Sequence, residues 1–314
     1  DGSVHEVMRR LRNDAPIHQT KDSEFGSYWS LTKYKDIVEV EALPLLYSSE
    51  MERGGISLID SEFAGAEQAE QNRMEMFIAM DPPRHTEKRR VVAPAFTPSE
   101  MTRLAGSIRE RTAARLDSLP KGEVFDWVSM VSVDLTTDML AILFDFPWDE
   151  RHKLPIWSDA ITSLDMIKNR QQERQVMMFE MAMKFFALWQ ERTAAEPAPD
   201  LLSMMIHSNA MSKMDQVEFI GNMALLIVGG NDTTRNSMSG YVYGLHSFQD
   251  EREKLEKNPA FITNAVSEII RWQTPLAHMR RTATQDHDLF GAPIKAGDKI
   301  GMWYLSANRD ESVF

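Results

Sequence analysis

The sequence predicts a mainly α-helical protein with small β-sheets. Apolar residues recur at helical spacing through most of the chain, whereas the runs with a strand-like composition are short. Of the 314 residues, 43% are apolar, which is enough to bury a large core. The fold class therefore follows from periodicity and element length before any motif is considered.

Composition argues against several classes of protein. The chain has 35 basic and 47 acidic residues and a net charge of -12, which disfavours a general nucleic-acid binder. No apolar run approaches the roughly 18 residues of a membrane span, and no signal peptide is visible. The absence of cysteine excludes a disulfide framework and is compatible with a cytoplasmic protein. Because the chain opens on Asp1, a start further upstream is also compatible with the sequence.

Elements near the N-terminus are predicted to be short. An amphipathic helix precedes a breaker at 14–16, and its apolar face is formed by Val4, Val7, Met8 and Leu11. A strand is expected at 28–31, and a second helix at 33–43 is ended by a proline. Residues 48–75 have mixed polarity and little period, as is typical of a lid or binding loop.

Helices are predicted to follow one another through the middle of the chain. Asp-Pro-Pro at 81–83 opens a helix with basic first turns, which suit either a solvated face or an anion site. Thr97-Pro-Ser-Glu100 is a capping box that starts a helix to about Ser118. Helical patterns at 131–146 and 154–167 are separated by a turn that contains proline.

Residues 166–189 are rich in methionine and aromatic side chains. Methionine adapts to irregular apolar space, so this segment is compatible with a pocket for an alkyl chain. An ordinary helix core is the favoured interpretation. After a linker at 194–200, Ser212-Lys-Met-Asp215 is expected to cap the next helix.

That next helix contains two adjacent glycines. Residues 223–228 are apolar on every side, and Gly229 and Gly230 follow them. Glycine costs a helix interior roughly 1 kcal/mol relative to alanine, so a kink is expected where a small ligand could approach the backbone. Asp232 beside Thr233 could then carry protons inward. A helix that ends at Gly230 is the alternative, but apolar residues resume in register at 238–245 and favour one long helix.

The C-terminal part combines helices with short strands. Helices are expected at 250–257 and after Asn258-Pro259, and the second carries Glu268 and Arg271 among apolar neighbours that suggest partial burial. Strand-like pieces follow at 288–290 and 299–305.

Several chemistries lack their motifs in this sequence. The eight histidines are scattered, without the spacing of a helical metal site. The sequence has no Walker loop, no Gly-x-Gly-x-x-Gly fingerprint and no Gly-x-Ser-x-Gly elbow. It therefore carries no flavin or nicotinamide motif of its own.

Four segments, in this order, resemble those of the cytochrome P450 family of haem-thiolate monooxygenases. His85-Thr-Glu-Lys-Arg89 resembles the C-helix motif, whose histidine and arginine hold a haem propionate. Gly229-Gly-Asn-Asp-Thr-Thr234 resembles the I-helix motif and puts Asp232 and Thr233 at the oxygen-activating positions. Glu268-Ile-Ile-Arg271 matches the K-helix motif, and Arg281 falls where a second propionate-binding arginine is expected.

The resemblance implies a cytochrome P450 fold, as a single domain over residues 1–314 that is truncated at the C-terminus. In this family a cysteine thiolate holds the iron, and the loop that carries it is expected beyond Phe314, together with the final helix. The parent protein is expected to use haem b, O2 and electrons from NAD(P)H, and this chain alone is expected to be inactive. The cofactor-binding residues implied are His85, Arg89, Gly229, Gly230 and Arg281, with Glu268 and Arg271 as a structural pair.

Segments 81–85, 91–96 and 302–310 look most like the soluble bacterial branch that hydroxylates alkanes and fatty acids at the terminal carbon. This implies insertion of one oxygen atom into a C–H bond of a medium-chain alkane, alcohol or fatty acid. Terminal attack requires walls that confine the chain end. The candidate wall residues are Leu226, Val228, Leu276, Ala277 and Met279. The competing class is a non-catalytic helical protein that keeps the scaffold and binds haem or lipid.

The expected partners are a ferredoxin and its reductase, which the resemblance implies because the chain has no redox motif of its own. Arg84, Lys88 and Arg90 offer a basic docking patch for an acidic partner. Otherwise a monomer is expected, with a small hydrophobic substrate and without nucleic acid or stable membrane insertion.

Overall fold

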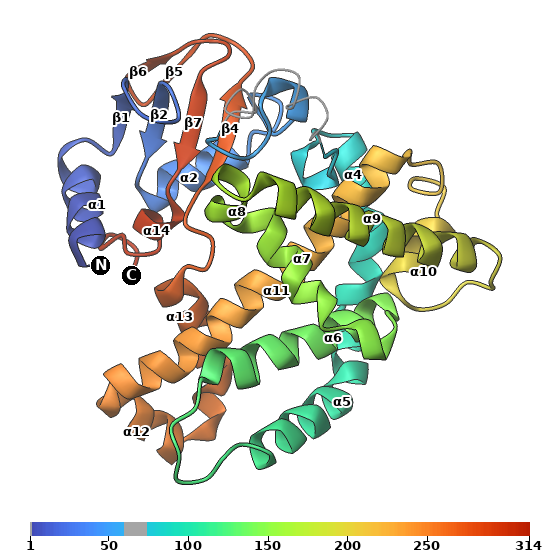
Figure 1. Cartoon of the computed structure of the whole chain (residues 1–314). Coiled ribbons are helices and arrows are strands. Elements are labelled where there is room, and N and C mark those ends of the chain that lie inside the picture. Colours follow the sequence, from blue (N-terminus) through green and yellow to red (C-terminus); the bar gives the residue numbers. More distant parts are fainter. Residues whose placement is uncertain (1, 60–73) are drawn as a thin grey trace. The chain divides into compact units, whose positions relative to one another are not determined.

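The computed structural model describes residues 2–59 and 74–314. They form two compact units, one made of residues up to 86 together with 263–314, the other of residues 87–262. Helices make up most of the second unit and the strands of the first are two to five residues long, which confirms the mainly α fold class with small sheets (Figure 1). The single domain expected over 1–314 stays a prediction.

A mixed five-stranded sheet organises the first unit, in the order β1-β2-β7-β4-β3. Its strands are β1 (Ile17–Thr20), β2 (Tyr28–Leu31), β3 (Tyr47–Ser48), β4 (Met279–Ala283) and β7 (Lys299–Met302). Only β2 and β7 run parallel to each other. A separate hairpin pairs β5 (His287–Leu289) with β6 (Ala292–Ile294). Leu31, Ile300 and Met302 are fully buried in the core of this unit.

The helices predicted near the N-terminus are confirmed as α1 (Gly2–Asp14) and α2 (Tyr34–Glu41), and β2 is the predicted strand. The apolar face of α1 is only partly covered, because Met8 is buried while Val4 and Val7 are exposed. Arg12 is buried instead, and its guanidinium donates to the carbonyl oxygen of Ser306. The loop expected at 48–75 contains a short 3₁₀ helix, η1 (Met51–Arg53). Residues 60–73 of that loop lie outside the described residues.

The C-terminal strand prediction was wrong in its extent. The strand expected at 299–305 ends at Met302, because the amides of Ser306 and Ala307 turn back to the carbonyl oxygen of Trp303 and form α14 (Tyr304–Ala307). The strand expected at 288–290 begins and ends one residue earlier, because Phe290 adopts a positive φ of 52°. Strands β1, β3, β4 and β6 were not predicted: β1 and β3 are short and have no strand-like apolar pattern, β4 carries two arginines and β6 a proline.

Helices form the second unit almost entirely. They are α5 (Pro98–Asp117), the π-helix η5 (Val128–Val133), α6 (Asp134–Phe144), α7 (Lys153–Thr162), α8 (Leu164–Lys168), α9 (Gln171–Thr193), α10 (Leu201–Ile206), α11 (Gln216–Ser247) and α12 (Gln249–Lys257). The division between the units falls inside α4 (Arg84–Val92) and at the start of α13 (Ile262–Gln273). Short 3₁₀ turns, η3 (Phe77–Ala79), η4 (Ala93–Phe96), η6 (Trp148–Glu150) and η7 (Pro259–Phe261), connect several of these elements.

Side-chain caps set several helix ends. The N-cap half of the predicted capping box is confirmed, since the Thr97 side chain accepts a hydrogen bond from the Glu100 amide at 3.4 Å. The reciprocal half was wrong, because the Thr97 amide donates to the Pro94 carbonyl oxygen and the Glu100 carboxylate accepts from Arg103. The helix expected at 154–167 is divided at Ser163, which has extended backbone and caps α8. The start of α11 is capped by Asp215, whose carboxylate accepts from the Glu218 amide at 2.9 Å. Of the segment 212–215 that was expected to cap this helix, only the last residue, Asp215, supplies the cap.

Helix α11 is the longest element of the second unit and runs through both glycines without a break. Its 32 residues correspond to about 48 Å of helix. The prediction of one long helix is confirmed, and the alternative that ends at Gly230 was wrong. Met223, Ala224 and Ile227 of α11 are fully buried, and the helix packs against α7, α6 and η5 (Figure 1).

The methionine-rich segment contributes both to this core and to the surface. Met181 and Phe185 of α9 are fully buried, and the Phe185 ring centroid lies 5.6 Å from that of Phe144. The core interpretation is confirmed for these two residues. Phe179 and Met183 on the same helix are exposed.

Candidate active site

The two glycines of α11 face different surroundings. A Cβ atom built on Gly229 would meet nothing within 4 Å, whereas one on Gly230 would lie 2.5 Å from Cδ2 of Leu140. Gly230 therefore allows α6 to approach the backbone of α11 closely. At Gly229 the backbone of α11 is open, since nothing lies within 4 Å of the position of its missing Cβ.

Side chains on α11 divide between two faces. An α-helix turns by about 100° per residue, so Leu226, Gly229 and Thr233 share one face. Val228 is two residues from Leu226 and projects about 200° away from it, so the two cannot line the same wall. The expectation that both confine one substrate stays a prediction, and this geometry disfavours it, because of the two only Leu226 lies on the open face.

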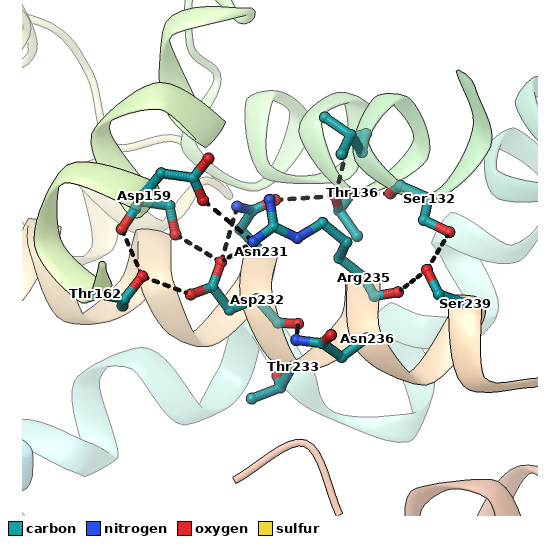
Figure 2. A network of polar contacts seen from close by, with 12 residues as sticks. Ser132, Thr136, Asp159, Thr162, Asn231, Asp232, Thr233, Arg235, Asn236 and Ser239 are labelled. Carbon is teal, nitrogen blue, oxygen red and sulfur yellow. Dashed lines mark hydrogen bonds and ion pairs between the residues drawn. The ribbon is translucent and has the colours of Figure 1, made fainter. Parts of the chain in front are cut away.

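Thr233 lies on the open face with its hydroxyl engaged. Its Oγ1 donates to the Gly229 carbonyl oxygen at 2.9 Å, one turn earlier in α11. Figure 2 shows the Thr233 side chain pointing away from the carboxylate of Asp232. Asp232 and Thr233, which were predicted to act together, are therefore adjacent in the chain but face different sides of the helix.

Asp232 is the centre of a polar network between α11 and α7 (Figure 2). Its Oδ2 accepts from Thr162 Oγ1 at 3.0 Å, and its Oδ1 accepts from Ser158 Oγ at 3.1 Å. Arg235 Nη2 and Asn231 Nδ2 also donate to Oδ1, at 3.0 and 3.2 Å. The carboxylate thus has four donors from four side chains. These donors were missed in the sequence, although residues 158 and 162, four apart on a helix, present their hydroxyls to one side.

The basic residues at the start of α4 have different environments. Lys88 is buried and forms an ion pair with Glu218, and the two side chains are 11% and 12% exposed. The docking patch expected from Arg84, Lys88 and Arg90 is therefore wrong for Lys88, which points inward. Arg90 is exposed. Arg89, the expected propionate ligand, is also exposed and has no ion pair within residues 2–59 and 74–314.

His85 and Arg84 belong to the first unit. His85 is half-buried, and its ring centroid lies 6.5 Å from that of Phe77. The Arg84 guanidinium lies 3.6 Å from carboxylate oxygens of both Glu50 and Glu75.

Strand β4 carries two adjacent arginines that point to opposite faces. Arg281, the second expected propionate ligand, donates to the Arg280 carbonyl oxygen at 2.9 Å and lies 3.4 Å from Glu41. Arg280 is buried, and its Nη2 donates to the Arg53 carbonyl oxygen at 3.0 Å. A Cβ on Gly54 would collide with this guanidinium, so Gly54 leaves the space that Arg280 fills.

The pair Glu268 and Arg271 in α13 is formed as predicted. Arg271 Nε donates to Glu268 Oε2 at 2.8 Å, and these hydrogen bonds hold the pKa of Glu268 below its ordinary value. Arg271 Nη1 also donates to the Asn308 carbonyl oxygen at 2.5 Å. The expected partial burial holds for Arg271, whose side chain is 22% exposed, but was wrong for Glu268, which is 58% exposed.

The other candidate wall residues lie after α13. Leu276 and Ala277 are exposed, and the Ala277 carbonyl oxygen accepts from the Leu305 amide at 3.0 Å. Met279 begins β4 and packs against the core of the first unit. Leu276 and Ala277 are thus available to a ligand, while Met279 contributes mainly to the core.

A haem group fits part of this residue set. Haem propionates bind cations, and Arg89 has no competing ion pair within the described part of the chain. Nothing lies within 4 Å of the Cβ position at Gly229, so the described residues put no obstacle before a bound group at that point of α11. The 314 residues contain no cysteine, so none of them supplies a thiolate to the iron.

Among residues 2–59 and 74–314, no three His, Cys, Asp or Glu side chains form a group that could hold a metal ion. In the same part of the chain, no helix combines the length and hydropathy needed to cross a membrane.

Known proteins resemble this chain over nearly its whole length. It is 34% identical to linalool 8-monooxygenase of Pseudomonas putida over 315 residues, which cover 99% of this chain and 77% of the relative. The structure of cytochrome P450-153 from Novosphingobium aromaticivorans matches with a TM-score of 0.92 and 51% identity, covering 98% of this chain and 76% of that one. CYP153D17 from a Sphingomonas species matches with a TM-score of 0.90 and 58% identity, with the same coverage of 98% and 76%. No protein-family model matches the sequence.

Proposed function

Since the chain belongs to the cytochrome P450 family of monooxygenases, we propose that it inserts one oxygen atom of O2 into a terminal C–H bond of a medium-chain alkane, alcohol or fatty acid. Enzymes of this family carry haem iron and take electrons from NAD(P)H through partner proteins. The observation that carries the proposal is the open face of α11, where Leu226, Gly229 and Thr233 place an apolar wall, bare backbone and one hydroxyl side by side.

Haem, when bound, supplies the activation of O2. The residues proposed to hold it are Arg89, which would bind a propionate, and Gly229, which would leave room on the open face of α11, with His85 and Arg281 as the further propionate ligands expected from the resemblance. Arg89 suits this role because its guanidinium is exposed and always charged. Gly230 is better assigned to helix packing, since Leu140 occupies the space beside it.

Proton delivery is proposed for Thr233 and Asp232. The Thr233 hydroxyl lies on the open face and can give its proton at Oγ1 when it leaves the Gly229 carbonyl oxygen. Asp232 is the adjacent acid that replaces this proton. Its carboxylate faces α7, where the Thr162 side chain is exposed. Protons from water can reach the acid from that side.

The substrate proposal depends on confinement of the chain end. A primary C–H bond is stronger than its secondary neighbours. Terminal attack therefore requires that the placement of the chain end in the site, and not the bond strength, decides which carbon reacts. Leu226 in the second unit and Leu276 and Ala277 in the first are each proposed to contribute to this confinement, as the resemblance implies. Val228 is left out because it lies on another face of α11, and Met279 because it packs in the core.

A branched terpenoid alcohol is the second candidate substrate, because a curated relative with 34% identity is named for linalool. The experiment offers the haem-loaded enzyme an unbranched medium-chain alkane, the matching fatty acid and linalool, and identifies the products by mass. We expect the terminal alcohol of an unbranched chain to dominate. Turnover of linalool alone would favour the second candidate.

The wall is tested by regiochemistry in the same enzyme. Leu276→Ala should widen the site and raise the share of subterminal products several-fold. The matched control is Leu45→Ala, which shortens a leucine that is 78% exposed in the same unit. If both variants keep the parent's terminal share, Leu276 does not confine the chain end.

A ferredoxin and its reductase are the proposed electron donors. Arg90 is exposed on α4 and replaces Lys88 as the basic residue offered to an acidic partner. Arg90→Glu should slow reduction at low salt and flatten its dependence on salt. Lys121→Glu, at an exposed position after α5, is the control for net charge. Equal salt dependence in both variants would place the docking surface elsewhere.

A further inference from the structure

The side chain of Asn231 is buried beside Asp232, with no exposed surface. Its Oδ1 accepts from Thr136 Oγ1 of α6 at 3.0 Å, while its Nδ2 donates to Asp232 Oδ1 at 3.2 Å. A carboxylate can only accept hydrogen bonds, whereas a hydroxyl can donate, so these two neighbours fix which way the amide lies. Asn231 thus connects α6 to the carboxylate on α11.

Arg235 holds the same carboxylate from one turn further along α11. Its Nη2 lies 3.0 Å from Asp232 Oδ1 and 3.2 Å from Asp159 Oδ1 of α7. The Arg235 side chain is 19% exposed and that of Asp159 is 58% exposed, so one guanidinium joins the inner acid to an outer one. Ser158 and Thr162 complete the set from α7.

These contacts hold the carboxylate of Asp232 on the α7 side of α11. Two donors to the carboxylate, Asn231 and Arg235, come from its own helix, and two hydroxyl donors come from α7. All four hydrogen bonds would be lost if the side chain turned. Charge-assisted hydrogen bonds of this kind are stronger than those between neutral groups. The orientation of Asp232 is therefore set by residues that do not themselves lie on the open face of α11 (Figure 2).

We infer that Asn231 and Arg235 are positioning residues for the reaction: they keep the carboxylate of Asp232 on the α7 side, where it takes up protons, and so maintain the supply of protons that Asp232 passes to Thr233. This inference rests on the proposed role of Asp232 in proton delivery. It assigns no contact with substrate or haem to either residue. It also gives a chemical reason for asparagine at position 231, because a leucine of similar size could pack there but would leave Asp232 Oδ1 without that donor.

The test compares variants of the haem-loaded enzyme by product formed per electron consumed and by the solvent deuterium isotope effect. Asn231→Leu and Arg235→Met should each lower the product per electron by about three- to tenfold and change the isotope effect, while substrate affinity stays within about twofold. Arg235→Lys, which keeps the charge, should restore much of the loss. The matched control is Ser239→Ala. It removes an α11 hydroxyl that donates to Ser132 of η5 and to the Arg235 backbone carbonyl oxygen but makes no bond to Asp232.

A second measurement does not depend on activity. Urea midpoints of Asn231→Leu, Asp232→Asn and the double variant should be non-additive, with the double variant losing less than the sum of the two, because the residues share a hydrogen bond. Arg235→Met serves the same cycle if Asn231→Leu does not fold.

The outcomes separate this inference from the function on which it rests. If Asp232→Asn impairs product formation while Asn231→Leu and Arg235→Met behave like Ser239→Ala, the positioning role is overturned and the proton role of Asp232 stands. If Asp232→Asn itself leaves product per electron and isotope effect unchanged, the proposed proton role fails, and the positioning role with it.

Discussion

The side chain of Leu140 packs against the backbone of Gly230 more closely than any larger residue at position 230 would allow. Cδ2 of Leu140 would lie 2.5 Å from a Cβ at Gly230, well inside van der Waals contact, and Leu140 is 2% exposed. The neighbouring Gly229 has no such restraint. Two adjacent glycines with the same helix propensity therefore have separate roles, one in helix packing and one on an open face.

We expect opposite effects on stability from alanine at these two positions. Gly229→Ala should stabilise the protein by about 0.5–1 kcal/mol, because alanine favours the helix and meets no obstacle. Gly230→Ala should destabilise it by up to about 2 kcal/mol, because overpacking costs about 1–3 kcal/mol and helix propensity returns only about 1. Urea unfolding followed by tryptophan fluorescence measures both. Equal shifts in the two variants would contradict the packing role of Gly230.

The pair Lys88 and Glu218 is expected to act on stability. Removal of either charge leaves the other buried without a partner, which costs about 3–5 kcal/mol. Lys88→Met and Glu218→Leu should each cause a loss of that size, and the double variant should lose much less than their sum. Arg103→Ala is the control, since it breaks a more exposed pair with Glu100 and should cost no more than about 0.5 kcal/mol. Additive losses would show that the two charges do not interact.

His278 is expected to make the protein sensitive to mild acid. Burial lowers its pKa below the ordinary value of 6.5, and its ring centroid lies 4.8 Å from that of Trp303. As the pH falls below about 6.5, His278 therefore binds a proton in the unfolded chain but stays neutral in the folded chain. The stability that depends on neutral His278 is complete above that pH and is lost as the pH falls toward the folded pKa. His278→Phe keeps a ring beside Trp303 and should reduce the acid slope of the urea midpoint. An identical slope in parent and variant would rule out His278 as its source.

Thr233→Ala should separate electron consumption from product formation in the haem-loaded enzyme. The proposed donor at Oγ1 is lost, so NAD(P)H oxidation should continue while product per electron falls about tenfold or more and hydrogen peroxide is released instead. Thr233→Ser, which keeps a hydroxyl, should recover much of the yield. Thr234→Ala removes the exposed neighbouring hydroxyl and is expected to leave the yield unchanged. A normal yield in Thr233→Ala would exclude this residue from proton delivery.

Local patterns in the sequence were sufficient for the helices and for the motifs they carry. The cap at Thr97, the start of α4 after two prolines and the continuity of α11 all depend on residues within one or two turns of each other. The pair at Glu268 and Arg271 formed as predicted for the same reason. Strand boundaries were predicted less well. The chain direction after Met302 depends on a turn at Trp303, and a strand pattern does not reveal it.

The directions in which side chains point depended on contacts between distant segments. Lys88 meets Glu218, 130 positions away, and a basic helix start gave no sign that it would be buried. Thr162 donates to Asp232, although the two residues are 70 positions apart. The motif that contains Asp232 and Thr233 therefore could not reveal that the acid turns away from Thr233.

The sequence by itself determined that this protein is mainly helical, that one long helix carries two glycines and an acid beside a hydroxyl, and that the four segments occur in the order typical of the family. Helical periodicity and caps are local, and so they can be recognised one segment at a time. Only the tertiary structure decided that Gly230 serves packing while Gly229 stays open, that Lys88 is buried, and that Asn231, Arg235 and α7 hold Asp232 on its side of the helix. These features depend on which helices pack together and how closely, and that is settled only when the whole apolar core forms.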